Sequence, residues 1–109
     1  LVEKDRVLLA TSRSSELYVI DKATREFEVV TTEIGHGDGI AFTGKVGHYL
    51  VSSWAGEVFL ILPDFSKVSL LETESKGMNT ADIAFNKKEQ ILYVPTFFDN
   101  RVLAFRLVN

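Results

Sequence analysis

Short runs of β-branched and aromatic residues, separated by polar turn clusters, make up almost the whole chain. Runs of about four to eight such residues, bounded by turn clusters, are typical of β-strands. No stretch keeps a 3.6-residue period for more than a turn or two, so no helix is predicted. The predicted strands are residues 6–12, 16–21, 26–33, 39–44, 48–54, 57–63, 67–74, 81–86, 90–96 and 101–108.

The strands recur as a repeat. "GIAF" at 39–42 returns as "DIAF" at 82–85, and Ile40 and Ile83 are 43 residues apart. Leu17, Val58 and Val102 occupy matching places at spacings of 41 and 44 residues. A repeat of about 40–45 residues with four strands is typical of a β-propeller blade. The predicted fold class is therefore all-β, a β-propeller fragment of about two and a half four-stranded antiparallel blades.

We expect residues 1–109 to form a single propeller portion. With strands lettered A to D outward from the central tunnel, the blades are B–D over 6–33, A–D over 39–74 and A–C over 81–108. A β-sandwich or small barrel would also give strands every 8–12 residues. The matched motifs favour the propeller, and strand 58–62, apolar at every position, suits a sheet covered on both faces.

A propeller closes with about four to eight blades, more than 109 residues supply. We therefore expect the remaining blades as partners, from a missing N-terminal part or from other chains. A missing N-terminal part of the same polypeptide is the favoured source. Residues 1–109 expressed alone are expected to be insoluble or oligomeric, because the terminal blades would expose apolar faces.

Composition excludes several partners and chemistries. The net charge is −3 and the 12 Lys and Arg are scattered, which argues against nucleic acid and membrane partners. No cysteine is present, so thiolate chemistry and disulfides are excluded. Both the cytoplasm and an oxidising compartment are compatible with that, so the localisation stays open. No G-x-S-x-G, Walker A, H-E-x-x-H or EF-hand pattern occurs.

"GDGIAFTGKVGHYLVSSWAGEVFLI" and the following "NTADIAFNKKEQILYVPTFFDNRVLAFRL" resemble the senescence-marker-protein/gluconolactonase-like (regucalcin-like) family of six-bladed propellers. The resemblance implies that the chain is the C-terminal portion of such a propeller. It also implies a divalent metal, often calcium, at the tunnel mouth and hydrolysis of sugar lactones or related esters. In the family an aspartate before a glycine and an apolar residue opens an A strand and binds the metal. Asp38 matches that motif, whereas no metal role is transferred to Asn79 or Asp82.

Topology gives Asp38 a place that does not depend on the family. A residue that opens an innermost strand lies at the tunnel mouth, and a hard cation prefers carboxylate oxygen. Gly37 and Gly39 are expected to provide positive φ angles and close approach to a ligand. The alternative is an Asx turn, in which Asp38 accepts a hydrogen bond from its own loop.

Loops on the same face supply further candidates. Trp54, Phe97 and Phe98 would wall a ligand pocket, or would pack between blades. Arg13 would pair with a substrate anion, and His36 would be a metal neighbour or a general base. The catalytic residues are not identified. Two functions remain: metal-assisted lactone hydrolysis, or a non-catalytic propeller that binds a small molecule or a protein on this face.

Overall fold

The computed structural model describes residues 1–72, 80–96 and 100–107, and within them the chain forms ten β-strands and no helix. Sheet 1 holds β1 (Arg6–Ala10), β2 (Leu17–Asp21) and β3 (Phe27–Thr31). Sheet 2 holds β4 (Gly37–Phe42), β5 (Tyr49–Ser53), β6 (Glu57–Ile61) and β7 (Lys67–Glu72). Sheet 3 holds β8 (Ala84–Asn86), β9 (Ile91–Thr96) and β10 (Arg101–Arg106). The predicted all-β class is confirmed.

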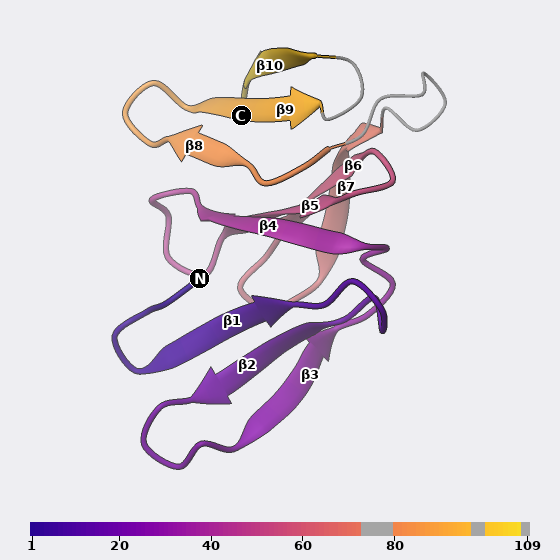
Figure 1. Cartoon of the computed structure of the whole chain (residues 1–109). Helices are drawn as coiled ribbons and strands as arrows, with labels where there is room; N and C mark the ends of the chain where they lie inside the picture. Colours follow the sequence, from indigo (N-terminus) through magenta and orange to yellow (C-terminus); the bar gives the residue numbers. More distant parts are fainter. Residues whose placement is uncertain (73–79, 97–99, 108–109) are drawn as a thin grey trace.

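Each sheet is an open antiparallel meander, because within a sheet every strand pairs with the next one along the chain. Three separate sheets, none closed on itself, are not the single small barrel considered from the sequence. Figure 1 shows the sheets stacked in chain order, with sheet 2 in the middle. The first strands lie side by side, since β4 contacts both β1 and β8. No described helix is long and apolar enough to cross a membrane.

The two central strands of the middle sheet, β5 and β6, are covered on both faces. All five residues of β5 are buried, and its side chains alternate between two apolar clusters. Tyr49 and Val51 pack with Leu8 and Leu17 of sheet 1. Leu50 instead packs in the cluster that includes residues of sheet 3. Two-sided burial explains why β6 reads as a nearly continuous apolar run rather than as an alternating one.

Residues 1–3 occupy the free edge of β1. Val2 forms a β-bridge with Val7. Leu8 N–H donates to the Leu1 carbonyl at 2.8 Å, and the Leu1 amino group donates to the Leu8 carbonyl at 2.8 Å. These contacts make residues 1–3 a short extended edge beside β1.

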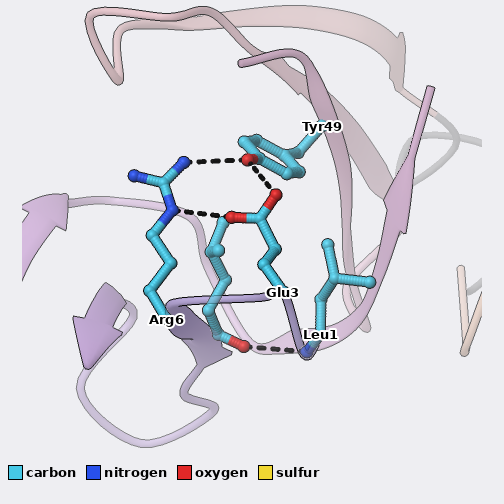
Figure 2. A network of polar contacts seen from close by, with 5 residues as sticks. Leu1, Glu3, Arg6 and Tyr49 are labelled. Atoms are coloured by element: carbon cyan, nitrogen blue, oxygen red, sulfur yellow. Dashed lines mark hydrogen bonds and ion pairs between the residues drawn. The ribbon is translucent and has the colours of Figure 1, made fainter. Parts of the chain in front are cut away.

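A polar network ties residues 1–3 to sheet 2 (Figure 2). Arg6 Nε donates to Glu3 Oε1 at 2.6 Å, and Arg6 Nη2 donates to the Tyr49 hydroxyl at 2.9 Å. The same hydroxyl donates to Glu3 Oε2 at 2.7 Å. Tyr49 is 1% exposed, so its ring joins the core while its oxygen closes the network. The network fixes the first sheet against the second at the end of the stack remote from Asp38.

Candidate carboxylate site beside the bulge of β4

Gly37, Asp38 and Gly39 lie inside β4 rather than before it. In the pairing of β4 with β5, Gly37 is opposite Ser53 and Ile40 is opposite Val51. Two residues of β4 therefore face one residue of β5, which is the arrangement of a β-bulge. A bulge explains how poor strand formers occupy a strand, and bulges are frequent beside functional sites because they redirect a side chain.

The two glycines are needed for space and not for their dihedral angles. Positive φ is found at Gly35, Gly44, Gly47 and Gly56 but at neither Gly37 nor Gly39, so the predicted φ > 0 is wrong. A Cβ on Gly39 would lie 2.7 Å from the Ile83 nitrogen and 2.9 Å from the Asp82 Cα. Glycine at 39 lets the entry to sheet 3 approach β4 at backbone distance.

Two buried hydroxyls hold that approach. Ser52 Oγ accepts the Gly39 N–H at 2.9 Å and donates to the Ala81 carbonyl at 2.7 Å. Thr80 is 1% exposed, and its hydroxyl meets the carbonyl oxygens of Ser53 and of Glu57, the latter at 3.0 Å. Since buried polar groups need partners, these bonds fix residues 80–82 against β5.

Asp38 and Asp82 lie on either side of this junction, near enough for the charge of Asp82 to act on Asp38, and both residues are exposed. Within the described residues neither carboxylate accepts a hydrogen bond. The turn aspartates behave differently. Asp21 accepts the N–H groups of Ala23 and Thr24 at 2.8 and 2.9 Å, and Asp64 accepts the Ser66 N–H at 3.0 Å. The Asx-turn alternative thus describes Asp21 and Asp64 but not Asp38.

Electrostatics separate the two kinds of aspartate in the same way. Partial burial, followed by the charge of Asp82, raises the pKa of Asp38. Hydrogen bonds from Thr24 and Ala23 lower the pKa of Asp21, and those from Ser66 lower the pKa of Asp64. Two like charges held close favour either a proton or a cation between them.

His36, in the segment between β3 and β4, and Trp54, in the turn between β5 and β6, meet beside the bulge. Trp54 N–H donates to the His36 carbonyl at 2.7 Å, and Trp54 is half-buried. His36 is exposed, and its Nδ1 lies 3.2 Å from the Ser12 carbonyl, which calls for a proton on Nδ1. Arg13 follows Ser12 in an exposed turn. Three predicted residues thus share one end of the stack with Asp38, while Phe97 and Phe98 lie outside the described residues.

Sequence reasoning missed Asp82 as a partner and Ser52 and Thr80 as its supports. The repeat contained a signal for Asp82, because aligning "GIAF" at 39–42 with "DIAF" at 82–85 gives Asp82 the same position in its repeat as Gly39. Aligned strand starts on adjacent sheets bring such residues together. The hydroxyl supports carried no comparable pattern, since serine and threonine are common in turns of every kind.

Within residues 1–72, 80–96 and 100–107, no three His, Cys, Asp or Glu side chains gather closely enough to hold a metal ion. The site described is therefore a pair of carboxylates. Comparison with protein-family models, with curated proteins and with solved structures gives no match.

Proposed function

We propose that the chain is part of a six-bladed β-propeller of the gluconolactonase-like kind, and that Asp38 binds a divalent cation, of the calcium type, at the tunnel mouth. The single observation that carries this proposal is the pair of exposed carboxylates, Asp38 and Asp82, at the starts of adjacent inner strands. Three stacked meanders whose first strands are neighbours also support the ring arrangement.

The donor chemistry fits a hard cation. Calcium takes six to eight oxygen ligands and favours carboxylates. Asp38 and Asp82 supply carboxylate oxygens with no described hydrogen bond to lose. Burial first and then the charge of Asp82 raise the pKa of Asp38, and a bound cation would favour its ionised form. The remaining oxygens would come from other blades of the ring and from solvent.

The proposed activity is hydrolysis of a sugar lactone or related ester at this mouth. A bound divalent cation polarises a carbonyl and lowers the pKa of a water. The chain's own contribution is positional: Ser52 and Thr80 hold residues 80–82 at a constant distance from the bulge. Trp54 and His36, beside the bulge, would line the approach of a substrate.

A calcium titration by calorimetry tests the cation. Asp38→Asn keeps the side-chain shape and removes one charge, so calcium affinity should fall about tenfold or more, equivalent to about 1.4 kcal/mol per tenfold. Asp21→Asn is the matched control, since it makes the same charge change in a turn of sheet 1 and should leave the affinity unaltered. Equal calcium binding by the Asp38→Asn protein and the wild type would refute the role of Asp38.

The second candidate is a non-catalytic propeller that binds a small molecule or protein on the same end, favoured by the half-buried Trp54 beside an exposed His36. A lactone-hydrolysis assay with calcium separates the two. Calcium binding without turnover of any aliphatic sugar lactone would leave the binding module as the function.

A further inference from the structure

One face of sheet 1 is apolar, and no sheet formed by the described residues packs against it. Leu9 is 47% exposed, Phe27 is 70% exposed and Val29 is 41% exposed. The register of β1, β2 and β3 places Leu9 beside Tyr18, Tyr18 beside Val29 and Ile20 beside Phe27 on this face. Leu9, Thr11, Tyr18, Ile20 and Phe27 line a shallow hollow of about 310 Å³.

The repeat says what kind of surface covers such a face. Leu9 stands 42 residues before Val51, and Tyr18 and Ile20 stand 41 residues before Phe59 and Ile61. Those later residues are 0%, 6% and 0% exposed, because sheet 1 packs on them. The outer face of sheet 1 is therefore the uncovered version of a face that sheet 2 buries against a neighbouring sheet.

The covering surface in the buried case is the opposite face of sheet 1, with Leu8 and Leu17 at its centre. The same chain carries an uncovered version of this surface as well. Leu17 corresponds to Val58 and then to Val102, which is 64% exposed. Val102 pairs with Pro95, and Ala104 pairs with Tyr93, so these four residues form the outward face of sheet 3.

We propose that a second copy of this chain covers the outer face of sheet 1, with the outward face of its own sheet 3. The contact repeats the packing of sheet 1 on sheet 2. It is head to tail, because the sheet 1 end of one copy meets the sheet 3 end of the other. A head-to-tail contact forms a ring when its rotation closes and a filament when it does not. Two copies with three sheets each supply six sheets, within the range of about four to eight blades in closed propellers.

This inference rests on the ring arrangement proposed above but not on the cation, so the two can fail separately. Loss of calcium binding leaves the mass of the particle unchanged. If the chain proves to be a monomer, the second-copy proposal fails. The calcium titration of the wild type and of Asp38→Asn still tests the cation separately.

Cross-linking tests the contact, because the chain has no cysteine of its own. Leu9→Cys and Val102→Cys proteins are prepared separately, mixed and oxidised. The mixture should give at least about tenfold more covalent dimer than either protein alone, because a head-to-tail contact brings residue 9 of one copy to residue 102 of the other. Dimer from Leu9→Cys alone would mean that equal faces meet, and would overturn the proposal.

Sedimentation equilibrium supplies an independent measurement. The wild-type chain should have twice its mass of 12.2 kDa, and Leu9→Lys should shift it to the single mass. Val46→Lys is the matched control, because Val46 is 87% exposed in the turn between β4 and β5, away from both faces. A wild-type monomer, or an open-ended series of larger particles, would overturn the closed pair.

Discussion

The hydroxyl of Tyr49 donates to Glu3 Oε2 at 2.7 Å. This hydrogen bond links sheet 2 to residues 1–3, which lie along the edge of β1. Burial alone would raise the pKa of Glu3, but the hydrogen bonds from Arg6 and Tyr49 outweigh it and lower that pKa. A carboxylate with a lowered pKa stabilises the fold above its unfolded pKa of about 4.3. That stabilisation is lost as the pH falls through the folded pKa.

Tyr49→Phe should therefore lower the free energy of unfolding by about 1–2 kcal/mol at pH 7, because both partners of the hydroxyl are charged. The loss should shrink below about pH 4, where Glu3 becomes protonated. Urea denaturation at a series of pH values, with the protein concentration held constant, measures this difference in the free energy of unfolding. Tyr18→Phe is the matched control, since its hydroxyl donates to Glu16 at 3.1 Å in a more open place, and a change of under about 0.5 kcal/mol is expected.

Ser52→Ala should cost about 1–3 kcal/mol of stability, because it leaves the buried Gly39 N–H and the Ala81 carbonyl without their partner. Ser69→Ala removes an exposed hydroxyl bonded to Glu57 and should be nearly silent. Thermal unfolding of both proteins compares them. Equal melting temperatures would show that the hydroxyl is not what holds sheet 3 against the bulge.

Asp38→Asn should slightly stabilise the cation-free protein at pH 7, by about 0.5 kcal/mol after solvent screening. The folded pKa of Asp38 is raised, so the folded state binds its proton more tightly and is disfavoured as the pH rises through that pKa. The gain from the substitution should vanish below about pH 4, where the wild-type carboxyl is also neutral. Chemical denaturation in a chelating buffer at pH 3.5 and 7 measures it, and a destabilised variant at pH 7 would contradict the repulsion.

The local part of the fold was predictable from residue types, and the junctions were not. Apolar runs such as 58–62 indicated strands covered on both faces, and β6 has two clusters around it as expected. The bulge was not predictable, because it depends on which residue of β5 lies opposite Gly37. Read locally, Gly-Asp-Gly is a turn sequence, and only the pairing partner distinguishes a bulge from a turn.

The candidate site shows the same division. The metal role of Asp38 stays a prediction, and the residue itself was singled out from its motif and its expected position at the start of an inner strand. Asp82 was not, because its approach depends on sheet 3 packing within backbone distance of Gly39. Sequence alone also suggested a dihedral role for Gly39, whereas its missing side chain matters for the space that Ile83 and Asp82 require.

The two-sided burial of β5 has a consequence for folding. Each sheet is a local meander, and local contacts of this kind form quickly. β1 and β9 each border one sheet interface, whereas β5 and β6 border both, so opening β5 to solvent requires both outer sheets to detach. Its backbone amides should exchange hydrogen only through global unfolding, and the strands of sheets 1 and 3 should exchange through smaller, separate openings. Cooperativity in this chain would then originate in the two central strands of sheet 2, β5 and β6.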